Sequence, residues 1–282
     1  MENISKSILS NVILPRKPNS YKGNYGRILI IAGSSNFGGA AILATSAAVH
    51  SGAGLVTVAS TPEKFTAINT RIPEAMTIDY HNKQLLLEAI ISSSVIAIGP
   101  GLGTTSVAKG LVKTVLNNTA TNQTVILDAS ALTIIASEKI PLQTTANIVM
   151  TPHQGEWQRL ANLPILEQTV SNNFEALEHL NHDAVLVLKK HHSEIYYHDQ
   201  VSQIEAGNPG MATGGMGDTL TGIIAGFIGQ FGFSLDTISA ALLIHSIIAD
   251  QLNEKHYVVL PSAIIRKLPK YMARYSQIES ED

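Results

Sequence analysis

The sequence predicts a three-layer α/β/α fold with a central, mostly parallel sheet and an antiparallel hairpin toward the C-terminus. Short apolar runs alternate with longer helical patterns along most of the 282 residues. The runs are rich in Val, Ile and Leu, as is typical of parallel strands that helices cover on both faces. After Lys190 this alternation ends, and the segments EIYYHD and QVSQIEA indicate a hairpin around Asp199-Gln200.

The predicted elements follow in a regular order. Buried strands are expected over residues 27–33, 55–60, 95–101, 124–130, 147–153 and 184–190. The Thr61-Pro62 pair is typical of a helix N-cap followed by proline at the first helical position. Helices are expected over 40–50, 105–117 and 174–180. A short helix is expected after residue 130, and another helix begins at Gln154. Two long apolar helices are expected over 218–231 and 235–253.

Composition excludes several classes of protein. Hydrophobic residues make up 45% and charged residues 15%, which favours a buried core over disorder. The net charge of −3 gives no basic field for nucleic acid or an anionic membrane. The chain has no cysteine, so disulfides, thiolate metal sites and cysteine nucleophiles are excluded. We therefore expect a cytoplasmic protein.

Neither a leader nor a membrane span is indicated. The first 20 residues are polar and interrupted by proline, without the basic start and apolar centre of a signal peptide. The longest apolar stretch, 220–233, contains four glycines and predicts a buried helix. We expect an N-terminal extension over 1–20, one catalytic domain over 21–275, and a C-terminal tail over 276–282.

Polar residues and glycines cluster where the predicted strands end. In open parallel sheets, ligands bind beyond the carboxyl ends of the strands. Several strand ends of this kind therefore predict a ligand site along one edge; they are 33–36, 99–103, Asp128, 151–153 and Lys189.

A glycine-rich segment, GNPGMATGGMGDTLTG over 207–222, opens directly into an apolar helix. Glycines allow close approach of the backbone to a ligand, and free N–H groups at a helix start attract anions. Asp218 stands at that start, where it fits two roles equally well: a helix cap, or a base that takes a proton from an attacking hydroxyl. No Gly-Lys-Ser/Thr follows, so this is not a Walker A loop, and its place after a hairpin excludes a dinucleotide fingerprint.

The segment GGMGDTLTGIIAG resembles the anion-hole signature of ribokinase-like vitamin kinases and of NAD(P)H-hydrate dehydratases. Further stretches favour the dehydratases, in order along 21–268: GRILIIAGSSNFGGAAILA, HSGAGLVTVAS, IAIGPGLG, VILDASAL and MTPHQGEW. The resemblance implies a ribokinase-like fold and repair of nicotinamide cofactors. Such enzymes use ATP or ADP to phosphorylate the hydroxyl of the S-epimer of hydrated NADH or NADPH, and loss of phosphate restores the ring.

The resemblance also implies roles for individual residues. Contacts to the hydrated dinucleotide fall on Ala40, Gly103, His153 and Asp218, with Asp218 as the base. Contacts to the adenine nucleotide fall on Lys189, Lys190, His191, His192, Ser193 and Gly217, and Gly215 and Gly217 would offer backbone N–H groups to the transferred phosphoryl group. Asn208 would bind substrate or hold the loop. Glu156 would help to hold Mg²⁺, through water, because Mg²⁺ retains several of its waters.

Plainer structural roles compete with some of these assignments. His153 also fits the cap of the next helix, and Asp128 fits the N-cap of the short helix at Ala129 better than a place beside the phosphates. Glu156 fits a solvent-facing acid in a first helical turn equally well. Trp157 is expected in the core. His191, His192 and His198 are expected to be mostly solvated, because they lie on the predicted hairpin without a matching carboxylate for a metal site.

Two rival functions stay open. A kinase for a vitamin precursor would share Asp218 and the glycine-rich loop. A nucleotide-binding regulator without catalysis is the other, because two positions depart from the family pattern: Lys190 replaces a glycine in the usual Lys-Gly-x-x-Thr, and Met216 replaces Thr in Gly-Gly-Thr-Gly-Asp. For the dehydratase we expect no nucleic-acid or membrane partner, a homo-oligomer, and a functional link to a separate NAD(P)H-hydrate epimerase.

Overall fold

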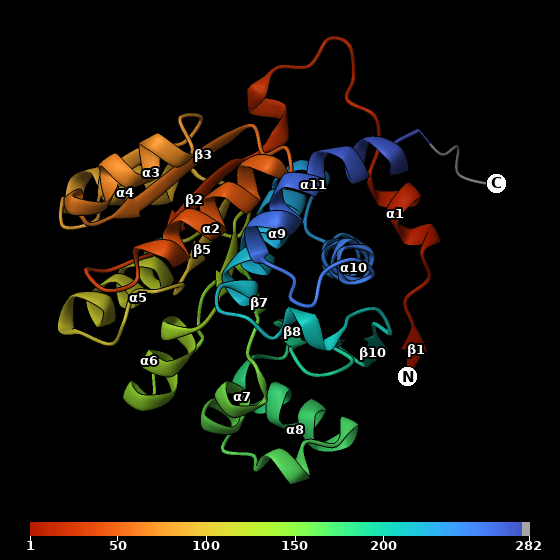
Figure 1. Ribbon diagram of the computed structural model, residues 1–282. Helices are drawn as coiled ribbons and strands as arrows, with labels where there is room; N and C mark the ends of the chain where they lie inside the picture. Colours follow the sequence, from red (N-terminus) through yellow and green to blue (C-terminus); the bar gives the residue numbers. More distant parts are fainter. Residues whose placement is uncertain (278–282) are drawn as a thin grey trace.

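One ten-stranded sheet organises the molecule, in the order β1-β10-β9-β8-β7-β6-β5-β2-β3-β4 (Figure 1). The computed structural model describes residues 1–277. All strand pairs are parallel from β8 to β4, whereas β9 is antiparallel to both β8 and β10. The strands are β1 (Glu2–Asn3), β2 (Arg27–Ile31), β3 (Leu55–Ser60), β4 (Met76–Asp79), β5 (Val95–Ile98), β6 (Thr124–Leu127), β7 (Asn147–Met150), β8 (Val185–Leu188), β9 (Glu194–Tyr197) and β10 (Gln200–Gln203).

Helices cover both faces of this sheet and bury two apolar layers. One layer lies under α1, α2, α3, α9, α10 and α11, and the other under α4 to α8. The helices are α1 (Ser7–Val12), α2 (Gly38–His50), α3 (Phe65–Arg71), α4 (Lys83–Ser92), α5 (Ser106–Asn118), α6 (Ser130–Glu138), α7 (Gln154–Ala161), α8 (Val170–Asn181), α9 (Met216–Phe231), α10 (Leu235–Asn253) and α11 (Pro261–Tyr275). The predicted three-layer fold, its parallel sheet and its hairpin are confirmed.

The first 20 residues pack onto this same body. Strand β1 adds to the sheet beside β10, and helix α1 lies against α10. Leu9 and Ile13 are buried in the apolar layer that α10 also covers. The predicted C-terminal tail, 276–282, lies outside the described residues except for positions 276 and 277.

Helix α10 is the one helix among the described residues that is long and apolar enough to cross a membrane. Two thirds of its apolar window is buried inside the protein, which is the environment of a core helix. The predicted core position of Trp157 is confirmed, since its side chain is fully buried and its indole N–H donates to Asn173 at 2.8 Å.

Candidate active site

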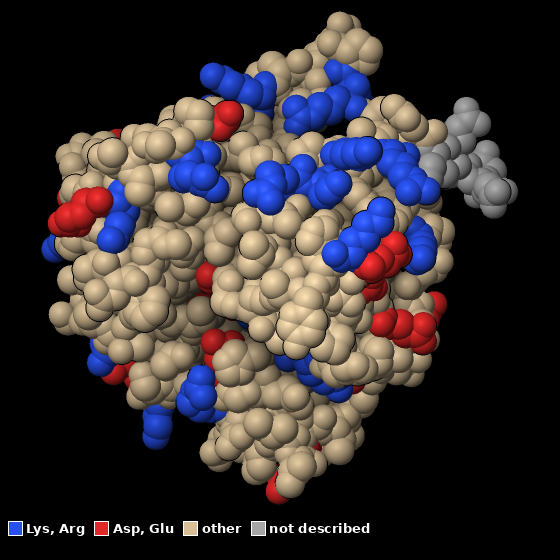
Figure 2. Space-filling view, in the orientation of Figure 1, with Lys and Arg blue, Asp and Glu red and all other residues tan. Residues whose placement is uncertain are grey.

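The carboxyl ends of β6, β7 and β8 meet at one edge of the sheet. Asp128 follows β6, His153 follows β7 and Lys189 follows β8. The parallel pairing of β7 with β8 continues as a bridge between His153 and Lys189, so the two residues lie side by side. A cavity of ≈ 780 Å³ opens there, between these strand ends, the loop before α9, and α10. Figure 2 shows acidic side chains inside a hollow near the middle of the face that it displays.

A buried ion pair forms the floor of the cavity. Lys189 Nζ lies 2.8 Å from Asp128 Oδ1, and Thr221 on α9 donates to Asp128 Oδ2 at 2.7 Å. Burial alone would raise the pKa of Asp128, but the Lys189 charge and the hydrogen bonds from Lys189, Thr221 and Thr151 hold this pKa below its usual value. The N-cap role predicted for Asp128 is wrong, because its side chain makes these contacts instead of capping α6.

The positive charge of Lys189 interacts with three nearby carboxylates. Burial would lower its pKa, yet the negative charges of Asp128, Glu156 and Asp218 raise it, so the ammonium stays charged. A Cβ atom at Gly217 would lie 3.1 Å from Lys189 Nζ, so the ammonium sits against the first turn of α9. Positive charge and the free N–H groups of a helix start therefore meet at one point, which suits a phosphoryl group.

Asp218 lies in the first turn of α9 and is not a helix cap. The N-cap position belongs to Gly215, whose φ of +90° is in the left-handed region that favours glycine, and no side chain caps this helix. Burial and the charge of Asp128 raise the pKa of Asp218 to about 6, although Lys189 opposes this. A carboxyl group with this pKa is ionised at neutral pH and ready to accept a proton.

His153 and Glu156 form a reciprocal cap at the start of α7. His153 Nδ1 accepts from the N–H groups of Gly155 and Glu156, at 3.0 and 3.3 Å, and the N–H of His153 donates to Glu156 Oε2 at 2.9 Å. The capping role considered for His153 is thus confirmed. Because Nδ1 accepts, a neutral His153 carries its proton on Nε2, at the wall of the cavity.

The alternative prediction for Glu156, a solvent-facing acid, is wrong. Its residue exposure is 8%, and the carboxylate lies at the cavity wall. Oε2 is used by the cap, whereas the nearest basic atom to Oε1 is His153 Nε2, at 3.6 Å.

The segment after Lys189 turns along the cavity toward β9. Lys190, His191 and Ser193 line the cavity, whereas His192 is absent from its wall and packs its ring edge-on against His191. The Lys190 ammonium pairs with the buried Glu194 carboxylate. Lys190 stands where the family pattern has glycine, and the Glu194 carboxylate neutralises its charge.

Asn208 is held in place by an aspartate that the sequence did not single out. Asp250 on α10 accepts from the N–H of Gly207 at 3.0 Å and from Asn208 Nδ2 at 2.7 Å. Since Nδ2 is engaged, Asn208 Oδ1 is a buried acceptor with no partner among the described protein atoms. The structure confirms that Asn208 helps to hold the loop, whereas its binding of substrate through Oδ1 stays a prediction.

Ala40 and Gly103 lie outside the residues that line the cavity, farther along the same sheet edge. The loop after β5 packs against α2, since a Cβ at Gly101 would come within 2.8 Å of the Ala40 side chain. Gly103 has open space around its Cα and donates its N–H to Ser130. One continuous row is therefore formed by the ends of five neighbouring strands, β8, β7, β6, β5 and β2. An extended ligand can lie along such a row.

His245 is a cavity residue that sequence reasoning missed. It lies on α10 and is buried, and its Nε2 has no partner among the described atoms. Burial and the Lys189 charge lower its pKa to about 4, so it is neutral at pH 7. One signal was present in the sequence: His245 is an isolated polar ring in an otherwise apolar helical stretch.

Comparison with known proteins identifies the family to which this chain is similar. Residues 28–270 match the family model described as NAD(P)H-hydrate dehydratase. An ADP-dependent (S)-NAD(P)H-hydrate dehydratase of Lactiplantibacillus plantarum is 48% identical over 279 residues, which is 99% of each chain.

Solved structures agree with the sequence relatives. A ribokinase-like superfamily protein of Enterococcus faecalis, 43% identical, superposes with a TM-score of 0.95 over 99% of this chain and 97% of the other. The ADP/ATP-dependent NAD(P)H-hydrate dehydratase of Bacillus subtilis, co-crystallised with ATP and Mg²⁺, gives 0.86 at 29% identity, over 97% and 98% of the two chains.

Proposed function

We propose a residue-level account of catalysis for this chain, which belongs to the NAD(P)H-hydrate dehydratase family and has the ribokinase-like fold. It uses an adenine nucleotide to dehydrate the S-epimer of hydrated NADH or NADPH, and so restores the reduced cofactor. The observation that carries the account is the meeting of Asp218, Lys189 and the N-terminus of α9 at one cavity. The dehydratase assignment takes precedence over the vitamin-kinase and regulator alternatives.

Asp218 acts as the base in the first half of the reaction. The ring hydroxyl of the substrate attacks the terminal phosphorus of the nucleotide, its proton passes to the Asp218 carboxylate, and the shortened nucleotide leaves with the electrons of the broken P–O bond. In the second half, the C–O bond breaks and phosphate departs with its electron pair. A proton lost from the neighbouring ring carbon leaves the pair that forms the double bond. Phosphate is a good leaving group where hydroxide is a poor one.

The transferred phosphoryl group sits on the first turn of α9. The backbone N–H groups of Gly215 and Gly217 point to its oxygens, and the Lys189 ammonium offsets the charge that spreads over them. Gly215 is suited to this place because its left-handed backbone and the nearby Leu43 side chain leave no room for a Cβ. Lys189, Lys190, His191, His192 and Ser193 form the nucleotide side of the site, with His192 supporting the ring of His191.

The hydrated dinucleotide extends along the row of strand ends. Its reacting ring lies at Asp218, with His153 and Asn208 beside it, and the remainder runs toward Gly103 and Ala40. Nε2–H of His153 is a donor and Oδ1 of Asn208 an acceptor, so the two residues offer complementary hydrogen bonds to substrate.

Mg²⁺ is the metal that fits the donors present. Mg²⁺ prefers oxygen ligands and retains several of its waters. Glu156 offers the carboxylate oxygen Oε1, which the helix cap leaves available at the cavity wall. Glu156 would hold the ion through water, and the ion would neutralise phosphate charge when bound.

The wider setting follows from the resemblance of the sequence. The enzyme works in the cytoplasm as a homo-oligomer, residues 21–275 form its catalytic domain, and a separate epimerase supplies the S-epimer. A monomer in light scattering at micromolar concentration would contradict the oligomer.

Recovery of NADH absorbance tests the function. The purified chain is incubated with hydrated NADH, Mg²⁺ and either ADP or ATP. Absorbance is expected to return only with a nucleotide, with one phosphate released per NADH. A stable phosphate ester without NADH would contradict the dehydratase.

A further inference from the structure

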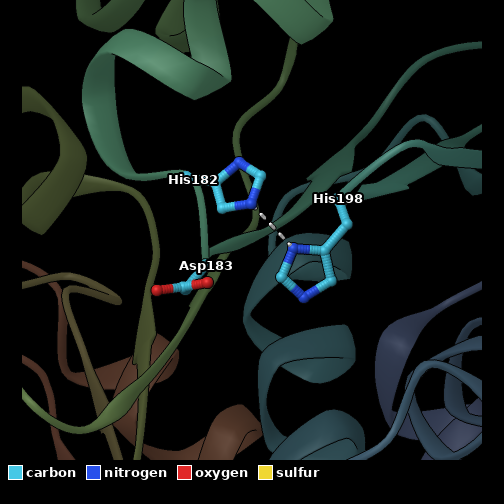
Figure 3. A group of neighbouring side chains, drawn as sticks. All are labelled: His182, Asp183 and His198. Carbon is cyan, nitrogen blue, oxygen red and sulfur yellow. Dashed lines mark hydrogen bonds between the residues drawn. The ribbon is translucent and has the colours of Figure 1, made fainter.

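A cluster of two histidines and one aspartate lies at the opposite end of the sheet from the cavity. His182 and Asp183 stand between α8 and β8, and His198 stands in the turn between β9 and β10 (Figure 3). Each residue offers one ligand atom, and these atoms lie within 4.8 Å of one another. The sequence places His198 16 residues from His182, and only the pairing of β8 with β9 brings them together.

The two rings are spaced as the ligands of a tetrahedral metal ion are. His198 Nδ1 lies 3.3 Å from His182 Nε2. Two nitrogens bound to Zn²⁺ at about 2.0–2.1 Å with a tetrahedral angle are about 3.3 Å apart. The rings face each other through these nitrogens in Figure 3, so one ion can bind both after only a small shift of the side chains.

Glu178 prepares His182 for this role. Its carboxylate hydrogen-bonds to His182 Nδ1, so the proton of the neutral ring is on Nδ1 and the Nε2 lone pair points at His198. A carboxylate behind a ligating histidine is the common arrangement around protein-bound zinc, where it fixes the ring and raises its basicity. His198 then needs only to carry its own proton on Nε2 to present Nδ1 to the ion.

We propose that His182, His198 and Asp183 bind a transition-metal ion, with Zn²⁺ as the best match. The three side chains are exposed, so water completes the tetrahedron. Nitrogen with carboxylate suits Zn²⁺ better than Mg²⁺, which prefers oxygen alone. The ion would tie the start of β8 to the turn of the β9–β10 hairpin, whose two ends lead to Ser193 and to the loop before α9.

Calorimetric titration with ZnCl₂ tests the site, on tag-free, metal-stripped protein with excess Mg²⁺ present. The absence of cysteine excludes thiolate binding elsewhere. We expect one high-affinity Zn²⁺ per chain and a higher Tm. The variant His198→Asn removes the ligand and keeps a residue that tolerates the left-handed backbone at this position, where φ is +49°. It and His182→Gln should lose high-affinity binding.

Two further variants separate a built site from general histidine binding. Glu178→Gln should weaken Zn²⁺ binding by about 10–100-fold, the usual effect of removing such a carboxylate. His256→Asn, which alters an exposed histidine elsewhere, should leave binding unchanged. Absence of tight binding to the native chain, or binding that His198→Asn and His182→Gln leave intact, would overturn the proposal.

Discussion

Replacing Lys189 with methionine should destabilise the protein strongly. The change removes the cation 2.8 Å from Asp128 and leaves that carboxylate buried, with the Thr221 and Thr151 hydroxyls as its remaining side-chain donors. Attraction across 2.8 Å is about 6 kcal/mol at an effective dielectric constant of about 20, before desolvation is subtracted. Breaking one side of a buried pair costs about 3–5 kcal/mol, which is the loss of unfolding free energy that we expect at pH 7.

The double variant Lys189→Met with Asp128→Asn is the matched control. It removes both charges, so most of the lost stability should return. Urea unfolding followed by the fluorescence of Trp157, the only tryptophan, measures both variants. A loss below about 1 kcal/mol in the single variant, or a double variant as unstable as the single one, would refute the role of the pair.

The pH dependence of this loss has a definite sign. In the native chain the pKa of Asp128 is lowered, so its stabilisation is present above the unfolded pKa and fades as pH falls through the folded one. Without Lys189, burial raises this pKa instead. The deficit of the single variant should therefore be largest at neutral pH and shrink as the solution is acidified.

Three further predictions concern the reaction. Since the pKa of Asp218 is raised to about 6, turnover should fall as pH drops through about 6, and a flat profile from pH 5 to 8 would contradict its role as the base. His153→Ala should cost about 1 kcal/mol of stability, because the helix cap is lost. His153→Asn keeps a capping side chain and should raise only the KM for hydrated NADH. Equal KM values for the native chain and the Asn variant would show that His153 is not in the substrate site. Asp250→Ala frees the loop at Asn208 and should raise this KM about tenfold, equivalent to about 1.4 kcal/mol, whereas the exposed Asp236→Ala on the same helix should not.

Local patterns predicted most of the parallel sheet. The strand expected over 55–60 has those bounds in the structure, and the helix expected over 235–253 is α10. Strands expected to run to residues 101, 130 and 153 end about three residues earlier, because the glycine, aspartate and histidine that follow them turn into the site. The apolar pattern marks the buried strand but not the point where pairing stops.

Other elements depend on contacts that no local pattern carries. Strand β1 has two exposed residues and exists only by pairing with β10, about 200 positions away. Strand β4 is a four-residue strand at the edge of the sheet, too short to give a clear alternating pattern. Helix α11 contains Pro269, and proline inside a helical pattern usually indicates the end of a helix.

The site shows the same division. Strand ends and the glycine loop predicted that Asp218, Lys189 and His153 share one cavity, and they do. Other parts of the site bring together residues that lie more than 25 positions apart, so only the fold reveals them. They are the Asp128–Lys189 pair, the contact of Asp250 with Asn208, and the place of His245 in the same cavity as Asp218 and Lys189. His182 and His198 are only 16 residues apart, but they meet because β9 pairs antiparallel with β8, which the sequence pattern around either histidine does not show.

Nucleotide-dependent recovery of NADH by Asp218→Asn, compared with the native chain, decides whether Asp218 is the base. We expect a folded variant with a rate lower by about 10²–10⁴-fold, the usual contribution of a general base. We also expect a gain in stability at pH 7 of up to about 3 kcal/mol, because a buried carboxylate with a pKa of about 6 is disfavoured when ionised. A variant that recovers NADH at the native rate would contradict the role of Asp218, and a native chain that recovers none with either nucleotide would contradict the function.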